Sequence, residues 1–157
     1  MTQDFITTEV AKIFGNKEFK YPLNVAMATV WILANFKGSD LKILDVGKHS
    51  SMADYFVIAS AGNPTQAGAM ADTVCQMMKK NNIAIKSLEG SSGSEWTLID
   101  LGDVIVHIFQ ETARNIYDLE GLYTTSNLVK IPENYYFQGQ EKQPKGPGTS
   151  SDDENYF

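Results

Sequence analysis

The chain has 157 residues, of which 43% are hydrophobic and 20% are charged, and its formal net charge at pH 7 is −6. This length and apolar content predict one globular domain with a substantial core and exclude a chain dominated by disorder. The acidic balance argues against a broad nucleic-acid surface, which needs clustered Lys and Arg. A basic protein is therefore the more natural partner.

Residues 1–22 are expected to form an N-terminal extension with a short amphipathic helix, because apolar residues recur there near helical spacing. The start lacks the basic and apolar segments of a secretory signal. The longest nearly charge-free apolar stretch, residues 23–36, is too short to cross a membrane. A cytoplasmic protein without membrane contact is therefore expected. Cys75 is the only cysteine, which excludes an intramolecular disulfide and a thiolate metal cage.

Apolar residues occupy most positions of residues 24–36, which predicts a helix packed on more than one side and ended by Gly38. Residues 41–46 and 55–61 are short and rich in β-branched or aromatic side chains, as is typical of strands. The polar residues between them predict a loop.

The strongest helix signal begins at Asn63. Asparagine suits the N-cap, Pro64 suits the first helical position, and Gln66 completes a capping-box spacing. An apolar stripe follows at helical spacing, which predicts a helix that ends near residues 81–82.

Three further strands are expected. Residues 84–90 give a weak strand signal and precede a flexible run, residues 91–95. Residues 96–100 and 104–109 are strong strand candidates. The short connection between them contains Gly102, whose tolerance of positive φ predicts an antiparallel hairpin.

The pattern changes again toward the C-terminus. Residues 112–123 predict a helix with Ile116, Leu119 and Tyr123 on one face. Residues 125–157 are expected to be a largely disordered C-terminal tail, because after about Pro132 the composition becomes rich in Gly, Pro, Ser and charge and cannot bury enough apolar surface.

Patterns for catalysis and metal binding are weak. The two histidines, His49 and His107, lie far apart and lack the spacing of a zinc motif. His107 is expected on a strand face with Ile105 and Phe109, as a hydrogen-bonded structural residue. The sequence contains no nucleophile elbow, Walker loop or dinucleotide motif, so no cofactor is expected.

A metal-dependent, nucleotidyltransferase-like enzyme is an alternative hypothesis, with Asp45, Asp54 and Asp100 as the magnesium ligands. Such chemistry generally uses two closely spaced acids on one strand, and the strand sequences LDV, DYF and IDL lack that pair. The hypothesis predicts binding of magnesium and nucleotide, which calorimetry would detect.

Trp96, Leu98 and Asp100 alternate along one predicted strand and therefore share a face. If no helix covers that face, it offers an aromatic anchor, an aliphatic contact and an acid in a row, which suits a binding hot spot. If a helix covers it, the same residues belong to the core. Composition does not choose between the two.

Two long runs resemble the ribosomal silencing factor (Iojap) family. Residues 89–123 contain Glu-Gly, a small-residue loop, Trp, an aspartate-ended strand, Gly-Asp, Val-Ile-Val-His, Arg and Tyr-x-Leu-Glu. Residues 44–74 resemble the first strand, the loop, the Asp-led second strand and the long helix of the family. The resemblance covers roughly residues 24–123 and defines a domain at residues 23–124.

The resemblance implies an α/β fold with a mixed sheet of about five strands flanked by helices, topologically like nucleotidyltransferases but without catalytic acids or enzyme activity. It also implies binding to the large ribosomal subunit through ribosomal protein L-fourteen, a basic protein of the joining face, with little direct nucleic-acid contact. Bound there, family members block subunit joining when nutrients are short. Family members also self-associate, and a homodimeric scaffold, motivated here by the apolar first helix and the methionines, is a third hypothesis.

The expected partner contacts are Trp96, Leu98 and Asp100, with Glu89, Arg114 and Tyr123 as further contributors. The alternative for Arg114 is a structural ion pair with Glu120. Two positions depart from the family pattern: Tyr123 stands where tryptophan is usual, and Gly121 lies inside the last predicted helix. Glycine in a helix is unfavourable, which predicts that this helix is shorter than its pattern.

Overall fold

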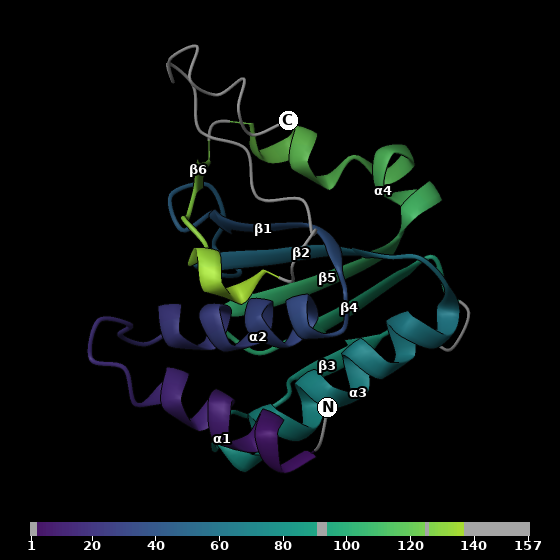
Figure 1. Cartoon of the computed structure of the whole chain (residues 1–157). Coiled ribbons are helices and arrows are strands. Elements are labelled where there is room, and N and C mark those ends of the chain that lie inside the picture. Colours follow the sequence, from purple (N-terminus) through teal and green to yellow (C-terminus); the bar gives the residue numbers. More distant parts are fainter. Residues whose placement is uncertain (1–2, 91–93, 125, 137–157) are drawn as a thin grey trace.

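The computed structural model describes residues 3–90, 94–124 and 126–136, so residues 91–93 of the expected flexible run and residues 137–157 of the expected tail lie outside the described residues. A mixed sheet carries helices on both of its faces (Figure 1). The elements along the chain are α1 (Gln3–Phe14), α2 (Leu23–Asn35), β1 (Ser39–Asp45), β2 (Tyr55–Ala61), α3 (Pro64–Lys80), β3 (Ser87–Glu89), β4 (Trp96–Asp100), β5 (Val104–Gln110), α4 (Glu111–Tyr117), η1 (Leu119–Tyr123), β6 (Asn127–Leu128) and η2 (Glu133–Tyr135). The expected α/β class is confirmed.

The sheet has six strands in the order β3-β4-β5-β2-β1-β6. β2 and β5 pair in parallel, and the other neighbours pair antiparallel. A parallel pair needs a long crossover, and the connection between β2 and β5 carries α3. The strand beyond the expected five is β6, whose two residues are too few to leave a periodic pattern.

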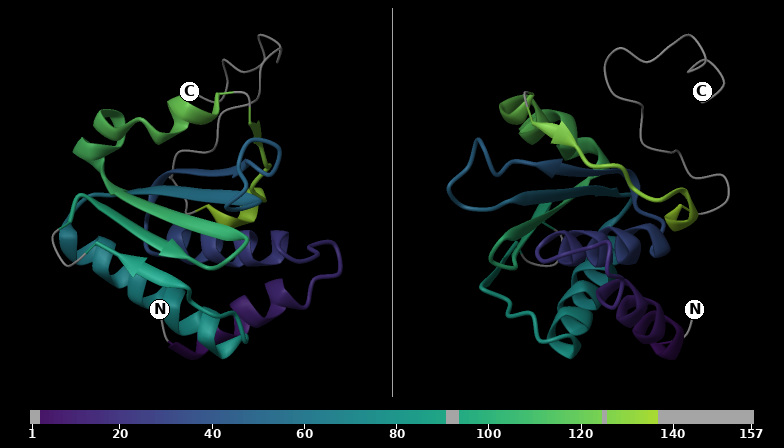
Figure 2. Two further views of the ribbon diagram at one scale, coloured as in Figure 1. Left: turned by 180° about the vertical axis from the view of Figure 1, so that it is seen from behind. Right: turned by 90° about the vertical axis from the view of Figure 1, so that its left-hand side faces the viewer.

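Helices α1, α2 and α3 cover one face of the sheet, and the main core lies between them and the strands (Figure 2). α2 is the central helix of this layer, and every residue from Val25 to Ala34 is buried. The expectation of a helix packed on several sides is therefore confirmed. Met27, Met70 and Met77 are buried in the same core, so the apolar helix and these methionines, which motivated the scaffold hypothesis, serve folding.

The end of α2 differs from the prediction by one residue. Lys37, not Gly38, is left-handed, with a φ of 62°, and the N–H of Gly38 donates to the carbonyl of Leu33 at 2.9 Å, as in a Schellman motif. A Cβ on Gly38 would lie 2.8 Å from that carbonyl oxygen and 2.9 Å from the Cε of Met70. Glycine is therefore needed here for close packing rather than for positive φ.

The predicted start and end of α3 are confirmed. The Asn63 side chain accepts a hydrogen bond from the backbone N–H of Gln66 at 2.8 Å, and the Gln66 side chain accepts one from Gly62 at 2.8 Å. The helix runs from Pro64 to Lys80. The hairpin between β4 and β5 also forms as expected, with a φ of 94° at Gly102.

Both ends of the described chain join the core. α1 buries Ile6, Val10 and Ile13. After η1, β6 pairs with β1, and Ile131 and Tyr135 are buried against the main core. The expected start of the tail at residue 125 is therefore too early, because a few separated apolar residues hold this segment on the sheet edge without a periodic signal. No helix in the described ranges is long and apolar enough to span a membrane.

Candidate partner-binding site

β4 alternates as its sequence predicts. Trp96, Leu98 and Asp100 are half-buried, whereas Thr97 and Ile99 are buried on the other face, which packs against the helical layer. The first three face away from α1, α2 and α3, on the side where, among the described elements, α4 and η1 lie over the sheet (Figure 2). This side of β4 is therefore neither fully covered core nor fully open surface.

Trp96 belongs to an aromatic cluster built from three strands, α4 and η1. Its ring stacks on Phe109 with centroids 5.0 Å apart and contacts Tyr117 at 5.0 Å. Phe109 lies directly opposite Trp96 in the β4–β5 register. Phe56 lies on β2 and contacts Tyr123 edge-on at 4.9 Å. Buried rings thus form a floor under the half-buried Trp96 and Tyr123.

His107 lies in the floor of this cluster. Its Nδ1 accepts a hydrogen bond from the indole Nε1 of Trp96 at 3.1 Å. Burial lowers the pKa of His107 to about 4, so the ring is neutral near pH 7. The expectation of a satisfied structural histidine is only half right, because its buried Nε2 has no hydrogen-bond partner among the described residues.

Acidic side chains border the row formed by Trp96 and Leu98. Glu89 is exposed on β3 and lies opposite Leu98 in the β3–β4 register. Asp100 lies at the end of β4, where one carboxylate oxygen accepts a hydrogen bond from the N–H of Gly102 at 2.9 Å. The row therefore combines an apolar centre with negative charge at one side and one end.

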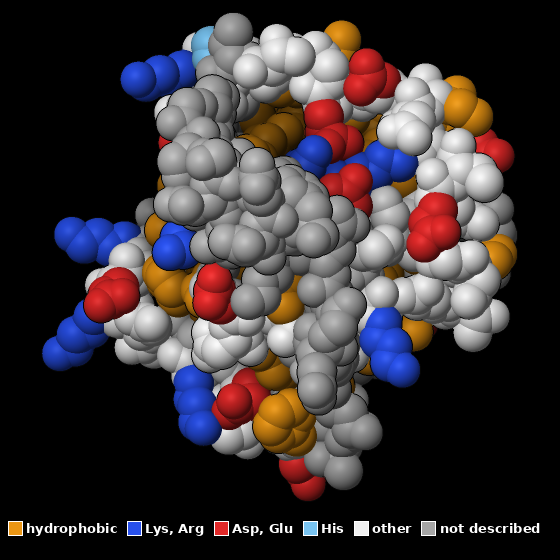
Figure 3. Space-filling view, turned by 45° about the horizontal axis from the view of Figure 1, so that its top comes forward, with side chains coloured by type: hydrophobic (Ala, Val, Ile, Leu, Met, Phe, Trp, Pro, Cys, Tyr) orange, Lys and Arg blue, Asp and Glu red, His pale blue; other side chains and the backbone are white. Residues whose placement is uncertain are grey.

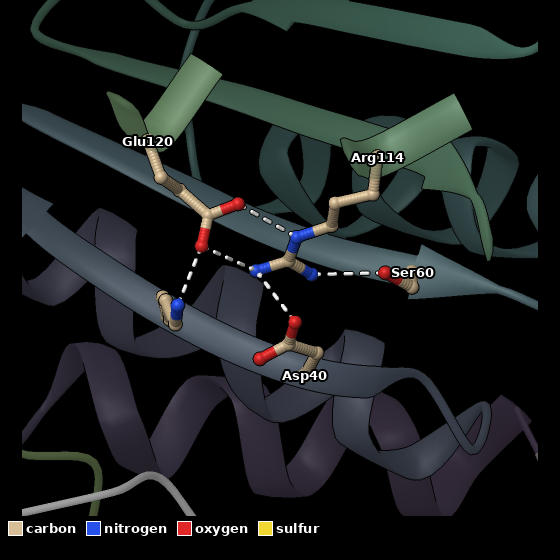
Figure 4. A network of polar contacts seen from close by, with 5 residues as sticks. Asp40, Ser60, Arg114 and Glu120 are labelled. Atoms are coloured by element: carbon tan, nitrogen blue, oxygen red, sulfur yellow. Dashed lines mark hydrogen bonds and ion pairs between the residues drawn. The ribbon is translucent and has the colours of Figure 1, made fainter. Parts of the chain in front are cut away.

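Arg114 is buried and forms the structural ion pair that was its alternative role (Figure 4). Its Nε and Nη2 donate to the two carboxylate oxygens of Glu120, at 2.9 and 3.3 Å, and its Nη1 donates to the Oγ of Ser60 at 2.9 Å. Asp40 lies 3.5 Å from Nη2, and Lys42 forms a second ion pair with Glu120. The guanidinium is thus engaged within the protein, and α4 and η1 are tied to β1 and β2.

Charged side chains of both signs gather beside hydrophobic ones in a hollow on the side of the molecule seen in Figure 3. Burial alone would raise the pKa of Glu120, but hydrogen bonds from Arg114 and Lys42 outweigh that effect and lower its pKa below the usual value. Glu120 is therefore ionised near pH 7 and keeps both ion pairs.

The helix predicted over residues 112–123 is not continuous, and it is shorter than its pattern, as the glycine at position 121 predicted. α4 ends at Tyr117, Asp118 is left-handed with a φ of 44°, and η1 follows as a 3₁₀-helix. On a continuous α-helix, residues six apart are separated by about 9 Å along the axis and about 120° around it, so Arg114 and Glu120 could not pair. Ile116 is 76% exposed, away from the face expected for it.

The three acids of the enzyme hypothesis do not converge on one site: Asp45 and Asp54 approach each other beside Gly47, but Asp100 lies apart from Asp45. Asp45 and Asp100 end β1 and β4, which are separated by two strands and hence by roughly 14 Å. Asp100 shares a sheet face with Leu44, so Asp45 points to the opposite face. Two-metal catalysis holds its ions about 4 Å apart. Within the part of the chain that the structure describes, no group of three or more His, Cys, Asp or Glu residues could hold a metal ion.

Sequence reasoning missed Phe56 and Tyr117 as members of the aromatic cluster. Phe56 joins it only because β2 pairs in parallel with β5, a pairing that no local pattern reports. Tyr117 joins it because α4 stops there and turns back over the sheet. The available signal for both was their aromatic character alone.

Comparison with known proteins identifies the family. The sequence profile described as "Ribosomal silencing factor during starvation" matches residues 21–156. The chain belongs to the ribosomal silencing factor family. It is 35% identical over 95 residues to ribosomal silencing factor RsfS of Bacillus subtilis, which covers 60% of this chain and 80% of that protein. The maize chloroplastic protein Iojap is 28% identical over 110 residues, 70% of this chain and 48% of that protein.

Solved structures of similar sequence support the same assignment. A crystal structure from Bacillus halodurans is 32% identical, with a TM-score of 0.59, and the match covers 74% of this chain and all of that one. One from Chromobacterium violaceum is 28% identical, with a TM-score of 0.60, over 75% of this chain and 86% of that one. The ribosomal silencing factors are a regulatory family of the ribosome rather than a family of enzymes.

Proposed function

We propose that this chain binds the large ribosomal subunit through ribosomal protein L-fourteen and sterically blocks the joining of the small subunit, which represses translation in the cytoplasm when nutrients are short. Membership of the ribosomal silencing factor family supports this proposal. The observation that carries the choice of site is the half-exposed row of Trp96 and Leu98 with acids on its borders.

The row has the composition of a binding hot spot. Tryptophan is enriched among residues that dominate binding energy, because it buries a large area and loses little conformational entropy. Trp96 is already stacked on Phe109 and in tilted contact with Tyr117, so it loses less freedom on binding than a mobile side chain would. Leu98 extends the apolar contact along β4.

Charge favours a basic protein as the partner. The chain carries a net charge of −6, and Glu89 and Asp100 border the row. Complementary charge accelerates encounter and fixes orientation more than it adds affinity. A steric block then needs only bulk on the joining face, so no reacting group is required.

The expected contacts have different roles in this proposal. Trp96 and Leu98 are the apolar contacts, Glu89 and Asp100 supply complementary charge, and Tyr123 lies at the border where it packs on Phe56. Arg114 is not proposed as a direct contact, because its side chain is 4% exposed and already paired. It acts through the position of α4 and η1.

Cosedimentation with purified large subunits, small subunits and joined ribosomes tests the proposal. Wild-type protein is expected to pellet with large subunits only and to reduce the fraction of joined ribosomes, and Trp96→Ala is expected to lose both effects. Met52→Ala is the matched control, because Met52 is 72% exposed and lies in the β1–β2 loop, at the end of the sheet away from Trp96.

Three outcomes would contradict the proposal. If the wild-type protein stays in the supernatant with every particle, the proposed function is wrong. If Trp96→Ala and Met52→Ala lose binding to large subunits equally, the assignment of the site to Trp96 is wrong. Binding to large subunits without fewer joined ribosomes removes the steric block but keeps the partner.

A further inference from the structure

Trp96 has one polar group, its indole N–H, and that group is satisfied inside the protein. Nε1 lies 3.1 Å from Nδ1 of His107 and donates to it. A neutral imidazole has one acceptor nitrogen and one donor nitrogen, so this hydrogen bond places the ring proton on Nε2. The indole therefore presents its apolar ring to a partner.

The acceptor is held rigidly. His107 is 3% exposed, its ring lies nearly parallel to Phe109 at 12°, and Phe56 contacts it at a steep angle with centroids 4.8 Å apart. Phe109 also stacks on Trp96. One hydrogen bond and one stacking contact therefore fix the tilt of the indole on the sheet.

A purely structural role does not account for a histidine here. Its Nε2 is buried without a hydrogen-bond partner among the described residues, and an unpaired buried donor is unfavourable. The surrounding cluster is aromatic and apolar, so phenylalanine would fill the position without that penalty. Phenylalanine, however, cannot accept a hydrogen bond from the indole N–H of Trp96.

We propose that His107 is a positioning residue of the partner-binding site, which holds the indole of Trp96 in the orientation that the partner meets. The proposal rests on the proposed function, because it assumes that Trp96 is the anchor. Fixing an anchor before binding reduces the entropy lost on association. Satisfying its N–H internally avoids leaving a polar group unpaired when the partner excludes water.

Nitrogen-15 NMR of the full chain tests the hydrogen bond directly. In wild type, the indole N–H of Trp96 is expected to exchange with water more slowly than that of a free indole, and Trp96→Phe assigns the signal. His107→Phe is expected to speed this exchange and to weaken binding to large subunits by about three- to tenfold. Its stability to urea is expected to equal or exceed that of wild type.

His107→Asn provides the rescue, because its amide oxygen can take the place of Nδ1. It is expected to restore slow exchange and part of the affinity, even where the smaller side chain lowers stability. A role in packing alone would give the opposite order, with phenylalanine tolerated and asparagine harmful to binding.

The outcomes separate the two proposals. Wild type that binds large subunits with an unprotected indole N–H, or His107→Phe that binds as wild type does, overturns the role of His107. Wild type with a protected indole N–H that binds no subunit overturns the proposed function instead. If His107→Phe does not fold, the exchange rate in wild type and His107→Asn decides the matter.

Discussion

Glu120→Ala is expected to lower the free energy of unfolding by about 3 kcal/mol, because it leaves the Arg114 guanidinium buried without its two-point partner. The Arg114 side chain is 4% exposed and the Glu120 side chain 23%, so water replaces the carboxylate only in part. Ser60 and Asp40 still contact Arg114, which keeps the cost at the lower end for a broken buried pair. In a chain of 157 residues, the melting temperature should fall by roughly 6–12 °C.

Urea unfolding and thermal unfolding followed by circular dichroism measure this change. Glu18→Ala is the matched control, since it removes the same side chain from an exposed turn. Its effect should stay within about 0.5 kcal/mol of wild type. Glu120→Ala should also increase quenching of Trp96 fluorescence by acrylamide, because α4 and η1 lose their tie to the sheet and Tyr117 loosens from the indole.

Glu120→Gln gives the pH dependence of the same interaction. The folded protein holds the pKa of Glu120 below its usual value of 4.5, so the ion pair stabilises the fold above that value. The stabilisation is lost as pH falls through the lower, folded pKa. The stability difference between wild type and Glu120→Gln should therefore be constant well above pH 4.5 and shrink as the pH falls below that value toward the folded pKa.

Two results would refute this reasoning. One is a Glu120→Ala protein within about 0.5 kcal/mol of wild type, which would mean that solvent or Asp40 replaces the carboxylate at no cost. The other is a difference between wild type and Glu120→Gln that does not shrink as the pH falls below the usual glutamate pKa of 4.5.

Three further changes are measurable by urea unfolding. Thr29→Val should raise the unfolding free energy by roughly 1 kcal/mol, because the buried Thr29 hydroxyl has no hydrogen-bond partner among the described residues. Gly90→Ala should lower it by about 2–3 kcal/mol, because φ is +92° and the new Cβ would lie 2.6 Å from the carbonyl oxygen of Trp96. Lowering the pH from about 6.5 to 4 should remove up to roughly 3 kcal/mol more from the unfolding free energy of wild type than from that of His107→Phe, since over most of this range the unfolded histidine binds a proton and the folded one does not.

Each of these has a contradicting result. A Thr29→Val protein less stable than wild type would mean that the hydroxyl is hydrogen-bonded. Gly90→Ala at wild-type stability would mean that the strand end shifts without cost. Parallel pH profiles for wild type and His107→Phe would mean that the histidine titrates normally in the folded state.

The sequence by itself determined the features that depend on a few neighbouring residues. The cap of α3 at Asn63, the turn at Gly102 and the shared face of Trp96, Leu98 and Asp100 were predicted correctly. Caps and turns involve backbone groups within four residues, and side chains of a strand alternate whatever its neighbours are. The family pattern added the α/β class and the link to the ribosome.

Only the tertiary structure decided how far that face is covered and which side chains support it. The parallel pairing of β2 with β5 places Phe56 next to His107. The break after α4 brings Glu120 to Arg114, which also pairs with Ser60, 54 residues earlier in the chain. Interactions between residues so far apart leave no periodic pattern in the sequence. They depend on the fold that brings the two partners together and not on a fixed spacing between them.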